Sequence, residues 1–94
     1  MARNGNVLVG TVQVELTNSD ATTITIKNCS PSNIYLTPTV GAVAPTSTSG
    51  ALELKPDEAF DSVTIAQFFS GVAGANRIYA IADRQDCKVF VSHA

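Results

Sequence analysis

The feature that most constrains the fold is a series of short β-rich runs separated by turn residues. It is clearest over residues 22–38, where the runs Thr22–Cys29 and Asn33–Pro38 flank a Ser-Pro-Ser-Asn turn. Apolar and polar residues alternate in both runs, so successive side chains point to opposite faces of a strand. Threonine and isoleucine suit such a strand because β-branched side chains pack on a pleated surface at little rotamer cost. We therefore expect residues 22–38 to form an antiparallel hairpin.

The same succession of run and turn continues along the rest of the chain. Further strands are expected at residues 7–16, 51–55, 58–65, 77–82 and 87–92. The segments between them are small-residue loops at 39–50 and 71–76 and a candidate helical turn at 66–70. Short strands spaced by about 8–12 residues are typical of a sandwich or a small barrel. The prediction is an all-β chain, a small antiparallel β-sandwich of seven to eight short strands with at most one helical turn near 66–70.

Alternation within the runs also predicts which side chains form the core. Val12, Val14 and Leu16 share one face of the first run, and Ile24 and Ile26 share one face of the second. These five side chains are expected to point inward. Both faces of residues 77–82 are apolar, which is typical of a central strand.

Length and composition indicate one small domain suited to an assembly. The 94 residues contain no linker, so we predict a single domain over residues 1–94, with a polar, flexible arm at about 1–6. Charged residues make up 15% of the chain, against about 25% in an average soluble domain. The surface is therefore covered largely by small, uncharged residues, which repel a neighbouring subunit only weakly.

Charge and hydropathy argue against two classes of partner. Six Lys and Arg residues and a net charge of −2 cannot supply a phosphate-binding patch, so no nucleic acid is expected. No apolar run approaches the roughly 20 residues of a membrane span. The N-terminal segment does not have the pattern of a secretory signal, so the chain is expected to be made and kept in the cytoplasm or assembled there.

The chain offers little that could perform catalysis or bind a metal. Cys29 and Cys87 have no Cys-x-x-Cys spacing and are expected to be free thiols, with a disulfide as the alternative. His93, the only histidine, lies one residue from the C-terminus and is expected to be solvated. The cluster Asp57, Glu58 and Asp61 is either a carboxylate site or, as we prefer, a set of solvated surface acids. We predict no catalytic residues, no cofactor, no metal and no enzymatic activity.

Segments with little or no charge are the candidates for contact with another protein. They are residues 1–10, 39–50 and 66–76. Phe68 and Phe69 cannot both point into one core from a strand, so either one of them meets a neighbouring subunit or a helical turn buries both. The predicted contact residues are Val7, Val9, Val40, Val43, Pro45, Phe68, Phe69 and Val72.

Five motifs together resemble small bacteriophage virion proteins of the β-sandwich type, in particular head decoration (cement) proteins. The likeness spans roughly residues 22–92 and departs from the family at Asp57, where glycine is frequent, and in the longer 62–76 segment. The motifs are Ile24-Thr25-Ile26-Lys27-Asn28, Asn33-Ile34-Tyr35-Leu36, Leu52-Glu53-Leu54-Lys55-Pro56-Asp57-Glu58, Ile78-Tyr79-Ala80-Ile81-Ala82 and Val89-Phe90-Val91-Ser92.

The resemblance implies a structural role with no catalytic residues. It implies a jelly-roll-like sandwich that forms a homo-oligomer, with a trimer favoured. It also implies binding to the major capsid protein or another virion protein, and a place in the virion, which is assembled in the host cytoplasm. One alternative is a tail, collar or baseplate component. A second is a carbohydrate- or ligand-binding β-sandwich module, against which the absence of Trp counts.

Overall fold

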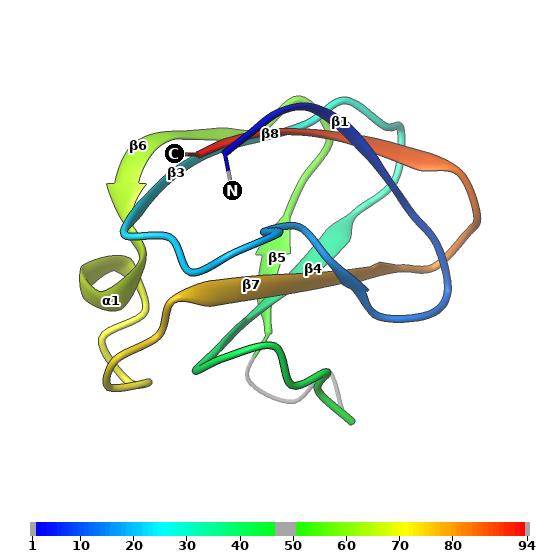
Figure 1. Cartoon of the computed structure of the whole chain (residues 1–94). Coiled ribbons are helices and arrows are strands. Elements are labelled where there is room, and N and C mark those ends of the chain that lie inside the picture. The colour runs from blue at the N-terminus through cyan, green and yellow to red at the C-terminus, as the bar shows by residue number, and fades with distance from the viewer. Residues whose placement is uncertain (1, 47–50, 94) are drawn as a thin grey trace.

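The chain forms a two-layer β-sandwich, seen in the computed structural model, which describes residues 2–46 and 51–93 (Figure 1). The elements are β1 (Arg3–Val9), β2 (Val14–Glu15), β3 (Thr23–Asn28), β4 (Ile34–Thr39), β5 (Leu52–Leu54), β6 (Ala59–Thr64), α1 (Ile65–Phe68), β7 (Arg77–Ala82) and β8 (Cys87–His93). Sheet A has the strand order β1-β8-β3-β6 and sheet B the order β2-β7-β4-β5. All of the strand pairs are antiparallel.

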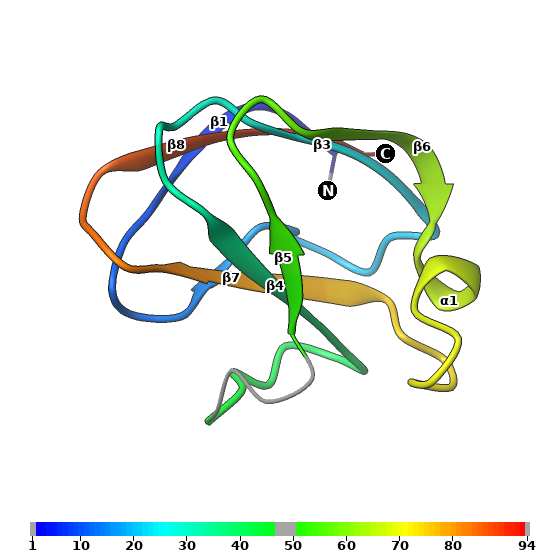
Figure 2. The ribbon, with the colours of Figure 1, turned by 180° about the vertical axis from the view of Figure 1, so that it is seen from behind.

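This strand order is that of an eight-stranded jelly roll. Every connection passes from one sheet to the other except that between β4 and β5 (Figures 1 and 2). The predicted all-β, jelly-roll-like sandwich is confirmed, with eight strands in the described residues and one helical turn, α1, close to the predicted position.

The hairpin predicted over residues 22–38 is wrong, although both of its strands exist. β3 lies in sheet A between β8 and β6, whereas β4 lies in sheet B between β7 and β5. The Ser30–Asn33 turn therefore carries the chain across the sandwich. Each strand has one apolar face, and the two faces bury each other from opposite sheets. Alternation identifies a strand but does not identify its hydrogen-bonding partner.

One buried amide organises this crossing. The fully buried Asn28 donates from Nδ2 to the carbonyl oxygens of Ser32 at 2.7 Å and of Leu54 at 2.9 Å. Its Oδ1 accepts from the backbone N–H and the hydroxyl of Ser30, at 2.9 and 2.7 Å. Both donors and the acceptor oxygen are thus satisfied, and the amide joins the end of β3, the turn and β5.

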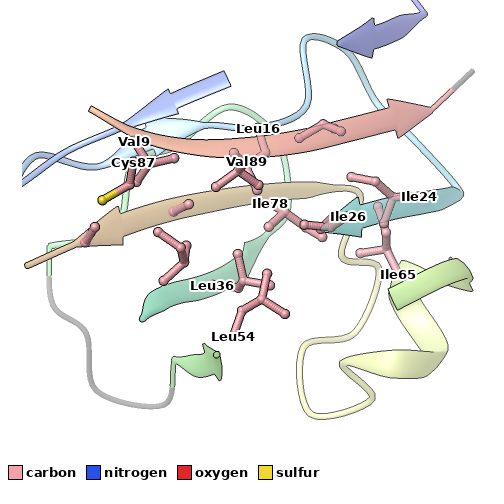
Figure 3. Packing of buried hydrophobic residues seen from close by; sticks show 14 of the residues in the cluster. Val9, Leu16, Ile24, Ile26, Leu36, Leu54, Ile65, Ile78, Cys87 and Val89 are labelled. Carbon is pink, nitrogen blue, oxygen red and sulfur yellow. The ribbon is translucent and has the colours of Figure 1, made fainter. Parts of the chain in front are cut away.

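The core lies between the sheets and consists almost wholly of aliphatic side chains (Figure 3). The predicted inward positions Leu16, Ile24 and Ile26 are confirmed as buried. Val14 is half-buried, but Val12 is 71% exposed, so its prediction is wrong. The chain turns at residues 10–13 instead of continuing as one strand, and Val12 lies in that turn. The central position predicted for residues 77–82 is confirmed, because β7 lies between β2 and β4.

The N-terminal segment is part of the sheet, which corrects the predicted flexible arm for residues 3–6. β1 pairs with β8 over its whole length, from Arg3 opposite His93 to Val9 opposite Cys87. The Arg3 guanidinium also donates to the carbonyl oxygen of Leu16 at 2.8 Å. These backbone bonds order the polar Asn4-Gly5-Asn6 run, which by composition alone reads as a mobile tail. Residue 1 of the predicted arm lies outside the described residues.

The predicted loop at residues 39–50 is described as far as Thr46. Thr39 closes β4, and residues 40–46 have no regular secondary structure. Residues 47–50 of this prediction lie outside the described part of the chain.

The two cysteines are free thiols, as predicted. Cys29 directly follows β3, and its backbone N–H donates to the carbonyl of Lys88 in β8 at 3.0 Å, one residue away from Cys87. Successive residues of a strand point to opposite faces. Cys29 is consequently exposed, while Cys87 is buried in the core.

We expect Asn28→Ala to lower the free energy of unfolding by about 2–4 kcal/mol, because it leaves several buried polar groups without partners. Asn33→Ala is the matched control. The Asn33 amide makes an exposed bond of 3.2 Å to Glu53, and its loss should change stability by less than about 0.5 kcal/mol. Urea unfolding followed by circular dichroism measures both variants, and equal effects would contradict the role assigned to Asn28.

The thiols should differ sharply in reactivity with a thiol reagent under native conditions. Cys29 should react at once and Cys87 at least about a hundredfold more slowly, because a core thiol reacts only after the fold opens. The variant Cys29→Ser should show only the slow phase. A disulfide found by mass spectrometry of the folded, unreduced protein would contradict this arrangement.

Candidate functional site

The candidate site is one end of the sandwich, formed by residues 40–46 and 65–76, which we call the uncharged end. These segments belong to the β4–β5 and β6–β7 connections and contain no Asp, Glu, Lys, Arg or His. The β5–β6 and β7–β8 connections, at the other end of these strands, are rich in charge. Their exposed charged residues are Lys55, Asp57, Glu58, Asp83, Arg84 and Asp86.

Asn76 holds three connections together at the uncharged end. Its backbone N–H donates to the carbonyl of Thr39 at 3.0 Å, and its carbonyl accepts from the N–H of Ala21 at 3.0 Å. Its side-chain Oδ1 accepts from the N–H of Gly41 at 2.8 Å. Gly41 has a φ of 76°, a left-handed conformation that suits glycine. The start of the 40–46 segment is therefore fixed against the β6–β7 connection.

Apolar side chains are exposed on both segments of the uncharged end. Val40 is 56% exposed, Val43 66% and Phe68 40%. Single exposed apolar residues are common on protein surfaces. These three lie on two uncharged segments that hydrogen bonds of Asn76 hold together. Such segments cost little to desolvate, so a protein partner can cover them.

The helical turn α1 explains how the two adjacent phenylalanines are divided. Ile65 is buried and anchors the turn, and its N–H donates to the carbonyl of Thr22 at 2.9 Å. Phe69 packs against the core, whereas Phe68 stays exposed, with its ring 4.7 Å from Phe60 and 5.0 Å from Phe69. The helical turn is present, but it does not bury both side chains, because Phe69 is only partly buried and Phe68 stays exposed.

The remaining predicted contact residues differ in how accessible they are. Phe69 and Val72 are partly buried against the core, and Pro45 and Val7 are half-buried. Val9 is fully buried between the sheets, so its side chain is not available to a partner. Val9 belongs to the alternate positions of β1 that face the core.

A cluster of paired charges borders the uncharged end on sheet B. Arg77 forms ion pairs with Glu15 at 2.6 Å and with Asp20 at 2.8 Å. Hydrogen bonds to Glu15, and then to Asp20, raise the pKa of the Arg77 guanidinium above its usual value. Sequence reasoning did not find this cluster, because its members lie on three separate segments.

Tyr79 lies beside this cluster with its side chain 7% exposed. Burial, followed by the negative charge of Glu15, raises the pKa of its phenol above the ordinary 10.0. The phenol therefore stays protonated in the folded chain at a pH where the unfolded chain releases the proton. Its contribution to stability is retained below pH 10 or so and declines as the pH rises above that value.

We expect the free energy of unfolding to fall as the pH rises through about 10, and Tyr79→Phe to weaken that fall. Denaturant unfolding of both proteins at neutral and alkaline pH measures the effect. Because lysine deprotonation affects both proteins alike, the difference between them isolates Tyr79. If the free energy of unfolding fell by the same amount at alkaline pH in both proteins, the effect could not be assigned to Tyr79.

His93 is buried, which corrects the prediction of a solvated terminal residue. Its Nε2 accepts from the backbone N–H of Asn18 at 3.4 Å, and its backbone pairs with Arg3. The signal was present in the sequence, because His93 continues the inward phase of Cys87, Val89 and Val91. The imidazole joins the end of β8 to the β2–β3 connection.

The acidic cluster of the sequence is distributed over a turn and a strand edge. A Glu58 carboxylate oxygen accepts from the N–H of Lys55 at 2.9 Å, and Asp61 accepts from the hydroxyl of Thr25 at 3.4 Å. Asp57 has a φ of 64° and donates its N–H to the carbonyl of Asn28 at 2.9 Å. Within residues 2–46 and 51–93, no three His, Cys, Asp or Glu side chains group as metal ligands do.

No family model matches the chain, and neither the curated proteins nor the solved structures contain a match to it. In the described part of the chain, no helix is long and apolar enough to span a membrane.

Proposed function

We propose that this chain is a non-enzymatic structural protein of a bacteriophage virion, a decoration or cement protein that self-associates and bridges shell subunits. The supporting observation is the uncharged end, where exposed apolar side chains lie on two segments without any charge. Its partner in this proposal is the major capsid protein or another virion protein. The proposal also draws on the motif resemblance described above.

The distribution of charge supports docking by one end. An uncharged surface loses little solvation energy when a partner covers it, whereas the exposed acids and bases of the opposite end would lose much more. The uncharged end would therefore face the shell and the charged end would face solvent. Jelly-roll domains also occur widely in virus capsids, which supports the proposal by analogy of fold only.

The exposed surface of the chain is large enough for both a contact with the shell and a contact with another copy of the chain. The chain exposes 4921 Å², and a standard interface covers about 800 Å² per partner, roughly one sixth of that surface. A shell contact through the uncharged end thus leaves most of the surface for self-association.

Substitution at the uncharged end should abolish binding to the particle whose genome encodes this chain. We expect Val43→Asp with Phe68→Asp to reduce occupancy on particles that lack the protein by at least about tenfold, because each buried carboxylate costs more than about 1.4 kcal/mol. Occupancy is measured by sedimentation and quantitative mass spectrometry, with heads and tails separated.

The control is Val12→Asp, which places a single carboxylate on another highly exposed valine, outside the uncharged end. It should bind as the unaltered chain does, and thermal unfolding should confirm that all the variants fold. Undiminished binding of the double variant would overturn docking by this end. Recovery of the chain with tails would instead favour the tail, collar or baseplate alternative.

The carbohydrate-binding alternative has weaker support. The phenol of Tyr79 is held toward Glu15, on the outer side of sheet B. A sugar-binding platform presents aromatic ring faces to solvent, but the Tyr79 side chain is only 7% exposed. No aromatic stacking surface is formed at this position.

A further inference from the structure

A sheet edge exposes unpaired backbone N–H and C=O groups, and folded proteins usually protect such edges. The four edge strands of the described chain are β1 and β6 in sheet A and β2 and β5 in sheet B. β2 has two residues and β5 has three, so each offers too little backbone to pair stably. Both edges of sheet B are thus protected by their shortness.

The β6 edge is protected by an irregularity. Its pairing with β3 shifts register between Ile24 and Ile26. In the shifted region Ser62 has a φ of 53° and donates its N–H to the Thr25 hydroxyl at 3.0 Å. Such a bulge twists the strand and interrupts the row of groups that another strand would need. The carboxylate of Asp61 adds a charge at the same place.

The β1 edge has none of these protections over Asn4–Val9. It is seven residues long and keeps one continuous register with β8, without a proline or a bulge. Its only charged residue is Arg3, at one end, whose guanidinium is bonded to Leu16 of the β2–β3 connection. In Figure 1, β1 runs along the near edge of sheet A with no other element in front of it.

We propose that β1 pairs with β1 of a second copy of this chain, antiparallel across a two-fold axis, and so joins two copies of sheet A into one. The strands of the chain itself indicate that the partner of β1 is a second copy. A second copy offers only one long, regular and unprotected strand among those described, and that strand is again β1. Such a contact is isologous, so each residue meets its counterpart in reverse order.

The sequence of β1 fits a pairing with itself. Full overlap of residues 3–9 places Asn6 on the axis, opposite its own copy, and brings Asn4 opposite Leu8. Asn4, Asn6 and Leu8 are all exposed on the outer face of sheet A. No like charges meet, and two asparagine amides can bond to each other at the centre. Each Arg3 lies at an outer end of the pair, opposite Val9.

This contact uses none of the residues of the uncharged end and does not depend on the proposed function. It is two-fold, whereas the resemblance to decoration proteins implies a trimer. The mass of the isolated chain in solution therefore tests it directly, with no particle present. Loss of shell binding and loss of this pairing are measured in separate experiments.

The oligomeric state of the full chain is measured by sedimentation velocity and light scattering over a dilution series. The variants place a charge at Asn6, the residue on the proposed two-fold axis. The unaltered chain should reach twice its 9.8 kDa mass. Asn6→Lys and Asn6→Asp should each weaken the dimer by at least about tenfold, because like charges then face each other. An equimolar mixture of the two variants should restore the dimer, since opposite charges now meet at the same position.

The control is Thr23→Lys, which adds the same charge to an exposed position on β3, an interior strand of the same sheet. It should dimerise as the unaltered chain does. Hydrogen exchange should also show protection of β1 amides that increases with protein concentration. A monomer at every concentration, a trimer insensitive to Asn6→Lys, or failure of the mixture to restore association would each overturn the proposal.

Discussion

The fold depends on the buried amide of Asn28, because it fixes the point at which the chain leaves one sheet for the other. Its four bonds reach the following turn and the neighbouring sheet, so a single side chain joins both layers. A buried amide without these partners would destabilise the fold. Three of the four bonds go to Ser30 and Ser32 of the turn itself, and the fourth goes to Leu54 of sheet B. The amide thus stabilises the turn in the conformation that carries the chain from sheet A to sheet B.

Once the crossing is made, the apolar faces of the two sheets close over one aliphatic core (Figure 3). At the other end of the strands, Asn76 performs the corresponding task and joins three connections through backbone and side-chain bonds. The uncharged segments therefore start from a rigid base. Rigid presentation lowers the ordering cost of binding, so exposed valines and a phenylalanine on such segments are well placed to meet a partner.

The molecule has two surfaces that could bind another protein, and each would do so through a different kind of interaction. The uncharged end combines exposed apolar side chains with little charge to desolvate, which favours burial by a protein surface. The β1 edge instead offers backbone hydrogen-bonding groups in a regular row, which favours another strand. Because the two surfaces share no residues, a chain of this size could use one for self-association and the other for docking.

The sequence by itself determined the all-β class, most strand positions, the inward phase of Ile24 and Ile26, and the uncharged segments, since alternation and composition are local properties. It also held an unused signal for the burial of His93, in the phase of β8. Only the tertiary structure decided that Ser30–Asn33 crosses between sheets, that residues 3–6 are paired, and that Glu15, Asp20 and Arg77 meet. Strand pairing, edge exposure and ion pairs join residues far apart in the chain. A local pattern does not encode such contacts, because they depend on which strands become neighbours.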